Sequence, residues 1–287
     1  MEPKDVSIIQ TLASQSGANV ENVMATNMSA AVSQPEAGQE CPQCMGSGWR
    51  NVSEHDRRVM PCECKLARRS RRLLENAGIP RRYELCTLES FKAEADDGKL
   101  VYAKEKAQAF VRQYPIDKTG LIFDGTSGSG KTHLAIGIIE GLISEKGVAC
   151  FFCGFQELLE KIKNSYDPSV QTTSMEVLRP VFESEVVIID DLGSVVPTGW
   201  VRDTVALILN KRYEDSKTTI ITTNYPDGPP AKPDGDDNAS RARQSNRDQT
   251  LGDRIGERMR DRIHEMCRVI NLWGVQSYRG KPRAVKR

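Results

Sequence analysis

Residues 125–132 read Gly-Thr-Ser-Gly-Ser-Gly-Lys-Thr, which fits the pattern G-x-x-x-x-G-K-[ST] of a phosphate-binding loop. The apolar run 121–123 before this loop predicts a buried strand, and apolar residues at helical spacing over 133–144 predict a helix after it. Its three glycines allow backbone N–H groups to turn toward a phosphate. The loop residues are Gly125, Thr126, Ser127, Gly128, Ser129, Gly130, Lys131 and Thr132. Strand, loop and helix together predict an α/β nucleotide-binding domain of the P-loop class.

Two side chains of the loop and three at other strand ends have the chemistry of a nucleotide site. Lys131 can reach the β- and γ-phosphates, and the hydroxyl of Thr132 can ligate Mg²⁺. The β-branched run 186–189 ends in Asp190 and Asp191, and the run 218–223 ends in Asn224. The ends of parallel strands meet at one edge of a sheet, so we expect these groups to lie beside the loop. We expect Asp190 to hold Mg²⁺ through water and Asp191 to orient or deprotonate the attacking water. We expect Asn224 to sense the γ-phosphate and position water.

Four of the eight cysteines predict a second site near the N-terminus. Cys41-Pro-Gln-Cys44 is a C-x-x-C pair, and Cys62-Glu-Cys64 follows after seventeen residues. Two pairs that bracket such a loop predict a tetrahedral structural zinc site, with unliganded thiols as the alternative and His55 as a possible substitute ligand. A module with so few apolar residues would need the metal in order to fold. The expected zinc ligands are Cys41, Cys44, Cys62 and Cys64.

The remaining elements complete an alternation of strands and helices. Residues 148–153 predict an all-apolar strand in which Cys150 and Cys153 point to opposite faces and therefore serve the core. Further helices are predicted at 65–76, 93–113, 155–166, 175–183, 201–213 and 251–266, and a last strand at 268–272.

The net charge of +1 conceals an uneven distribution. Residues 1–40 carry five acids and one base, whereas residues 41–82 and 251–287 each carry ten Arg or Lys against four acids. The two basic regions indicate a polyanionic or acidic partner, although solvated surfaces explain either region equally well. We find no secretory signal, and the longest apolar run, 134–143, is too short to span a bilayer. We therefore expect a cytoplasmic protein with reduced thiols and no membrane contact.

The composition divides the chain into three parts. Residues 1–40 have no aromatic residue and are predicted to be disordered, with a short docking helix as the alternative. Residues 41–78 comprise the zinc module and a basic helix that would contact phosphates or an acidic protein surface, or would simply be solvated. The nucleotide domain spans 79–287, with a flexible insertion at 226–249 and a basic tail at 280–287.

In this order the motifs resemble those of the AAA+ ATPases of the bacterial DnaC/DnaI helicase-loader type, which have the IstB transposition helpers as relatives. The resemblance covers roughly residues 79–279 and extends to Leu-Gly-Asp-Arg-Ile-Gly-Glu-Arg-Met-Arg at 251–260 and to Ser-Tyr-Arg at 277–279. It implies an AAA+-type parallel sheet flanked by helices, with ATP as the nucleotide. The four-cysteine module with its basic helix departs from the DnaC type and more closely resembles the phage and DnaI-like versions.

The resemblance also implies roles for three arginines and a helical pair. Arg254 and Arg258 lie four residues apart on one predicted helix face and would act as arginine fingers in a neighbouring subunit's ATP site. Arg279 matches a further nucleotide-responsive arginine. The two predicted helices within 155–184 occupy the place of a pair that contacts single-stranded DNA in the family.

By this resemblance, the chain is expected to be an ATPase that loads a hexameric DnaB-type replicative helicase onto single-stranded DNA. ATP hydrolysis would control assembly and release, and the trans arginines imply self-association. Two alternatives remain: an IstB-like ATPase for transposition or DNA remodelling, and an ATP-gated adaptor with negligible turnover. A metabolic kinase is disfavoured because the sequence has no acceptor-site signature.

Overall fold

The computed structural model describes residues 41–53, 56–93, 97–229 and 249–280. Three predictions lie wholly or largely outside these residues: the disordered segment 1–40, the insertion apart from its two ends, and the basic tail. His55 also lies outside them.

A five-stranded sheet forms the centre of the molecule, with the strand order β4-β5-β6-β3-β7. Every neighbouring pair in it is parallel, so all five carboxyl ends lie at one edge. Strand β3, which precedes the phosphate loop, lies between β6 and β7, so the loop lies among the carboxyl ends of the strands. The strands are β3 (Gly120–Gly125), β4 (Cys150–Gly154), β5 (Val186–Asp190), β6 (Thr218–Thr223) and β7 (Cys267–Leu272).

The twofold alternation of side chains along the strands divides the core into two layers. In β3, Leu121 and Phe123 pack into one layer, whereas Ile122 packs into the other. In β4, Cys150 belongs to the first layer and Cys153 to the second, and both thiols are buried. The prediction that these two cysteines serve the core is therefore confirmed.

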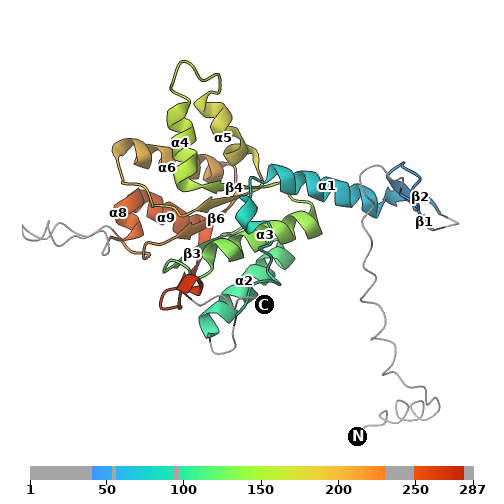
Figure 1. Ribbon diagram of the computed structural model, residues 1–287, viewed down its shortest axis with the longest axis horizontal. Coiled ribbons are helices and arrows are strands. Elements are labelled where there is room, and N and C mark those ends of the chain that lie inside the picture. Colours follow the sequence, from blue (N-terminus) through green and yellow to red (C-terminus); the bar gives the residue numbers. More distant parts are fainter. Residues whose placement is uncertain (1–40, 54–55, 94–96, 230–248, 281–287) are drawn as a thin grey trace, which may run out of the picture.

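Helices cover both faces of the sheet (Figure 1). One layer is completed by α2 (Gly98–Gln113), α3 (Lys131–Lys146) and the C-terminal end of α1 (Glu63–Asn76). The helices of the other layer are α4 (Phe155–Asn164), α5 (Ser174–Glu183), α6 (Gly199–Glu214), α8 (Leu251–Ile255) and α9 (Glu257–Met266). Among the described residues, no helix is both long enough and apolar enough to cross a membrane.

Two expected helices have different bounds in the structure. The helix predicted from residue 93 begins only at Gly98, where Asp97 caps it by accepting a hydrogen bond from Leu100 N. The single helix predicted over 251–266 is broken into α8 and α9 at Gly256, whose φ of 89° lies in the left-handed region that favours glycine. Helical periodicity continues through this position in the sequence, so it concealed the break.

A small N-terminal module stands apart from the sheet at the far end of α1 (Figure 1). It contains an antiparallel pair of strands, β1 (Trp49–Ser53) and β2 (Asp56–Pro61), and the last cysteines overlap the start of α1. Ala77, just after α1, is buried in the core and accepts a 2.7 Å hydrogen bond from Phe152 N of the edge strand β4. Ser70 also donates to the carbonyl of Ile143 in α3. The helix therefore holds the module at a defined position relative to the sheet.

Candidate nucleotide and zinc sites

The phosphate loop has the backbone geometry that its sequence predicts. Gly128 and Gly130 have φ values of 84° and 95°, which L-residues with a side chain rarely adopt. Gly130 immediately precedes α3, so the loop ends at a helix N-terminus whose free N–H groups and dipole favour an anion. Ser129 Oγ in the loop is buried and has no hydrogen-bond partner among the described residues. Its unpaired hydroxyl leaves the loop one further donor for phosphate.

Lys131 lies folded into the base of the loop. Its Nζ donates to the carbonyl oxygens of Gly125 and Thr126, both at 2.8 Å, and to Asn224 Oδ1 at 2.7 Å. Burial lowers the pKa of Lys131 to about 8, against the opposing effects of Asp191 and Asp190. The ammonium group therefore lies where phosphate oxygens could replace neutral carbonyls as its partners.

Thr132 and Asp190 form a pair of oxygen donors beside the loop. Thr132 Oγ1 donates to Asp190 Oδ1 at 2.8 Å, and Thr222 Oγ1 donates to the same oxygen at 2.7 Å. A hydroxyl next to a carboxylate suits the hard cation Mg²⁺, which prefers oxygen ligands. The residues present thus fit the magnesium ion predicted from the sequence.

Asp191 and Asn224 meet at the ends of β5 and β6. Asn224 Nδ2 donates to Asp191 Oδ1 at 2.5 Å, and the backbone N–H of Asp191 donates to Thr222 Oγ1 at 2.8 Å. Burial raises the pKa of Asp191, and the nearby charge of Asp190 raises it further. A carboxyl group with a raised pKa at the edge of a cleft is suited to accept a proton from water.

These groups line a cleft of about 1300 Å³ at the carboxyl edge of the sheet. The cleft is also lined by Arg82 and Tyr83, in a short helical turn before α2, and by residues 274–276, 278 and 279. Arg279 lines this cleft, as the family resemblance implies for a nucleotide-responsive arginine.

Sequence reasoning missed how the segment after β7 contacts the phosphate loop. Tyr278 N donates to Gly128 O at 3.0 Å, and Thr126 Oγ1 donates to Val275 O at 3.2 Å. Trp273 Nε1 donates at 2.9 Å to Asp124, whose pKa is raised by burial at the end of β3. These contacts join residues about 150 positions apart, and no local pattern in the sequence indicates them.

The two arginines assigned as fingers have different environments. Arg258 is exposed at the start of α9, whereas Arg254 in α8 is only 5% exposed. Arg254 bonds within its own chain, to the carbonyl oxygens of Gly193 and Val195. The expectation that both lie on one helix face is wrong, because Gly256 interrupts the helix between them.

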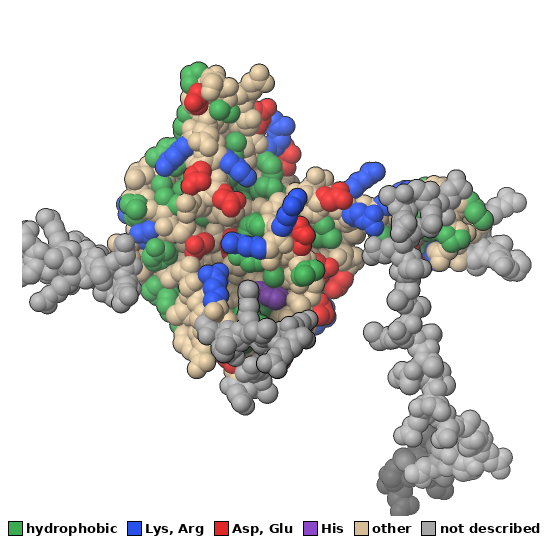
Figure 2. Space-filling model, viewed as in Figure 1, with side chains coloured by type: hydrophobic (Ala, Val, Ile, Leu, Met, Phe, Trp, Pro, Cys, Tyr) green, Lys and Arg blue, Asp and Glu red, His purple; other side chains and the backbone are tan. Residues whose placement is uncertain are grey.

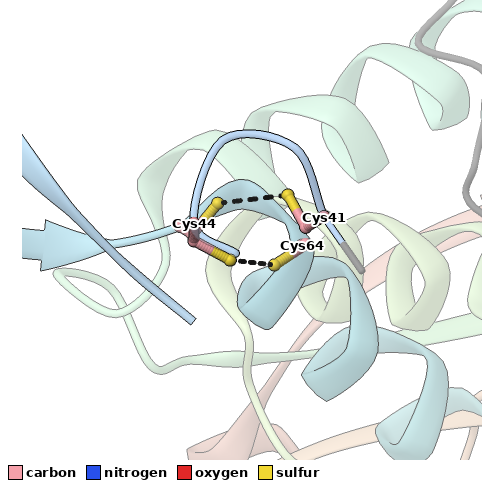
Figure 3. Close-up of side chains that lie close together, drawn as sticks. Cys41, Cys44 and Cys64 are labelled. Atoms are coloured by element: carbon pink, nitrogen blue, oxygen red, sulfur yellow. Dashed lines mark hydrogen bonds between the residues drawn. The ribbon is translucent and has the colours of Figure 1, made fainter. Parts of the chain in front are cut away.

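The four cysteines of the N-terminal module converge as predicted. Their sulfur atoms all lie within 4.8 Å of one another, with 3.8 Å between Cys41 and Cys62 and 3.4 Å between Cys44 and Cys64 (Figure 3). A tetrahedral ion with Zn–S bonds of about 2.3 Å holds its sulfur ligands about 3.8 Å apart. The arrangement therefore fits one zinc ion and leaves no open coordination position.

The parallel sheet, the phosphate loop at its carboxyl edge and the acidic strand end beside it define a P-loop nucleotide-binding protein. Its family follows from a comparison with known protein families. The model of the IstB-like ATP binding protein family matches residues 62–285, and the chain belongs to that family.

Known relatives extend the comparison. The chain is 26% identical over 240 residues to the uncharacterized protein YqaM of Bacillus subtilis (strain 168), covering 80% of this chain but only 66% of YqaM, just under two-thirds. It is 22% identical over 215 residues to the replicative helicase loader DnaC of Escherichia coli (strain K12), covering 75% of this chain and 78% of that protein. A crystal structure of the DnaC helicase loader superposes with a TM-score of 0.53 at 28% identity, over 67% of this chain and 99% of that one. The AAA+-type fold and the resemblance to helicase loaders are thereby confirmed.

Proposed function

We propose that this protein is an ATPase that loads a hexameric, DnaB-type replicative helicase onto single-stranded DNA. The observation that carries the proposal is the complete half-site at the carboxyl edge of the sheet, formed by the phosphate loop, Asp190, Asp191 and Asn224. It occurs in a chain similar to a helicase loader in both sequence and fold.

The residues of the half-site divide the work of ATP hydrolysis. Gly128, Gly130 and the start of α3 bind the phosphates through backbone N–H groups, and Lys131 exchanges its carbonyl partners for phosphate oxygens. Thr132 and Asp190 would hold Mg²⁺, which would neutralise phosphate charge. Asp191 accepts the proton of the attacking water while Asn224 keeps the carboxylate in place.

A neighbouring subunit supplies the positive charge that the half-site lacks. Arg258 projects into solvent at the start of α9, so a second copy can present it to the γ-phosphate. ATP bound in one subunit thereby favours self-association, and hydrolysis releases it. Arg279 contacts the nucleotide from within the same chain.

Two surfaces are assigned to the macromolecular partners. Lys161, Lys163 and Arg179 are exposed on α4 and α5 and bind the phosphates of single-stranded DNA. The zinc module at the end of α1 docks the helicase. Lys and Arg side chains lie on α1 beside this module (Figure 2).

The test is a loading assay with the full chain, the replicative helicase of the same cell, ATP and closed single-stranded DNA circles. Helicase should be retained on the circles only when the chain and ATP are both present, and Lys131→Ala should abolish retention. Lys146→Ala, an exposed lysine at the far end of α3, is the matched control. Failure of the wild-type chain to retain helicase contradicts the proposal.

One observation favours a second candidate, because the family model that matches the chain is named for IstB-like proteins. In that case the ATP-dependent partner is a transposase. A pull-down with ATP from the native cell separates the two, since a transposase recovered in place of a helicase supports the IstB-like function. An adaptor with negligible turnover would bind a partner with ATP but hydrolyse none.

A further inference from the structure

Arg254 occupies a buried position between the ends of two strands that carry the proposed hydrolytic residues. Its Nε donates to Gly193 O at 2.7 Å, and its Nη2 donates to Val195 O at 2.9 Å. The remaining Nη1 donates to Gln249 Oε1 at 2.7 Å, and the guanidinium lies 4.6 Å from the ring centroid of Tyr225. All three guanidinium nitrogens are thus used within the chain.

The partners of Arg254 are all neutral. Two are backbone carbonyls and one is an amide oxygen, and among the described residues no carboxylate forms an ion pair with it. A buried guanidinium without a counter-ion gains less than a paired one and still bears the cost of desolvation. A neutral side chain of similar volume would fill this space at lower cost, so the planar fork of the arginine serves geometry.

The bonds of Arg254 control a segment that begins at Asp191. Gly193 and Val195 are the second and fourth residues after this aspartate, whose own φ of 60° is left-handed. Strand β6 holds the near end of the segment, since Leu192 N donates to Thr222 O at 2.8 Å. Arg254 holds the far end, and its stacking on Tyr225 fixes the residue that follows Asn224. Arg254 thus contacts the segments that follow both β5 and β6, the strands whose ends carry Asp191 and Asn224.

We propose that Arg254 acts within its own subunit as a positioning residue for Asp191 and Asn224, and does not reach a neighbour's nucleotide. The inference rests on the proposed ATP hydrolysis. It separates Arg254 from Arg258, which a family resemblance treats as equivalent fingers. Arg254 touches neither nucleotide nor water. It keeps the 191–195 segment in the conformation that aims Asp191 into the cleft.

A mixed-subunit experiment distinguishes action in the same subunit from action in a neighbour. Lys131→Ala chains have an inactive ATP site of their own but can still supply every arginine that acts in a neighbouring subunit's site. Mixed with them, Arg258→Ala chains should regain turnover, because their intact sites receive a finger from the partner. Arg254→Ala chains should stay inactive in the same mixture, because the defect lies in their own site. Rescue of Arg254→Ala by Lys131→Ala chains overturns the proposal.

Steady-state kinetics of the full chain give the second readout. For Arg254→Ala we expect kcat to fall by about 100-fold, the size of effect that a small misplacement of a catalytic group produces. KM for ATP should stay within about twofold, since the phosphate loop is untouched. Arg254→Lys should recover part of kcat, because one ammonium can donate to Gly193 O or Val195 O but lacks the planar fork. An unchanged kcat in Arg254→Ala overturns the proposal.

Arg202→Ala is the matched control, because this exposed arginine also bonds α8, to Asp253 O at 3.0 Å. Among the described residues, it forms no hydrogen bond or ion pair with residues 191–195. It should keep the wild-type kcat. Both Arg254 variants must show cooperative thermal unfolding, and loss of the fold in both would make the residue purely structural and overturn the proposal.

Hydrogen exchange keeps this inference separate from the proposed function. Backbone amides of residues 192–196 should exchange faster in Arg254→Ala than in wild type, whether or not the chain hydrolyses ATP. If the wild-type protein does not hydrolyse ATP, only the proposed function is contradicted. Unchanged exchange in this segment contradicts the positioning role alone.

Discussion

Asn224 donates a 2.5 Å hydrogen bond from its side-chain amide to Oδ1 of Asp191. The orientation of the amide follows from its other partner, because Lys131 can only donate and therefore faces Asn224 Oδ1. One asparagine thus joins the lysine of the phosphate loop to the acid proposed as the general base. When phosphate oxygens draw Lys131 away, the contact between Asn224 and Asp191 is free to remain.

Asp191→Asn removes the proton acceptor while keeping the size of the side chain. We expect kcat for ATP hydrolysis to fall by about 100-fold or more, which is the usual contribution of a general base. ATP affinity should change little, because the phosphates are held by the loop. Turnover and the binding of a fluorescent ATP analogue check the two parts, and an unchanged kcat would show that another group activates the water.

Lys131→Ala should weaken the binding of ATP. Lys131 is only 6% exposed, and its Nζ donates to two backbone carbonyl oxygens and to Asn224 Oδ1. Phosphate oxygens of ATP would replace these neutral partners. We expect the affinity for ATP to fall at least tenfold, measured by titration calorimetry, with Lys146→Ala as an exposed control on the same helix. Equal affinities of the two variants would contradict the assignment of Lys131 to the phosphates.

The sequence was most informative where chemistry is carried by contiguous residues. Gly125–Thr132, Asp190 with Asp191 and the paired cysteines each occur as short patterns, and the order of the strands placed the first two together. Arg254 and Arg258 were misplaced relative to one another because helical spacing does not reveal a break at Gly256. Local patterns also carry no information about contacts such as Thr126 with Val275, which form only after the sheet is assembled.

The four cysteines predict one equivalent of zinc in the purified chain. Elemental analysis should find it, and Cys44→Ser should lose most of it because Cys44 is a buried ligand. Cys86→Ser should keep the full equivalent, since Cys86 lies outside the cluster. Well under one equivalent in the wild-type chain would leave the thiols unliganded and the zinc prediction wrong.

The last prediction concerns the stability of the fold at the amino ends of the strands, away from the cleft. Arg212 is fully buried, and its guanidinium donates to the carbonyl oxygens of Val181, Ser184, Glu185 and Thr218 and to the hydroxyl of Thr219. Burial lowers its pKa to about 10, so the side chain is still charged at neutral pH. It satisfies carbonyls at the end of α5 and near the starts of β5 and β6. Arg212→Met removes this donor from all of them, and its bonds to Val181, Thr218 and Thr219 are buried.

We expect Arg212→Met to lower the free energy of unfolding by about 3 kcal/mol or more, because each unsatisfied buried acceptor costs about 1–3 kcal/mol. Urea denaturation measures the change. Lys211→Met is the control: its exposed ion pair with Asp215 is worth at most about 1 kcal/mol. If Arg212→Met lowers the free energy of unfolding no more than the control does, the carbonyls must have found other hydrogen-bond donors. Because Arg212 lies at the amino ends of the strands and the cleft at their carboxyl ends, folded Arg212→Met protein should keep the wild-type KM for ATP.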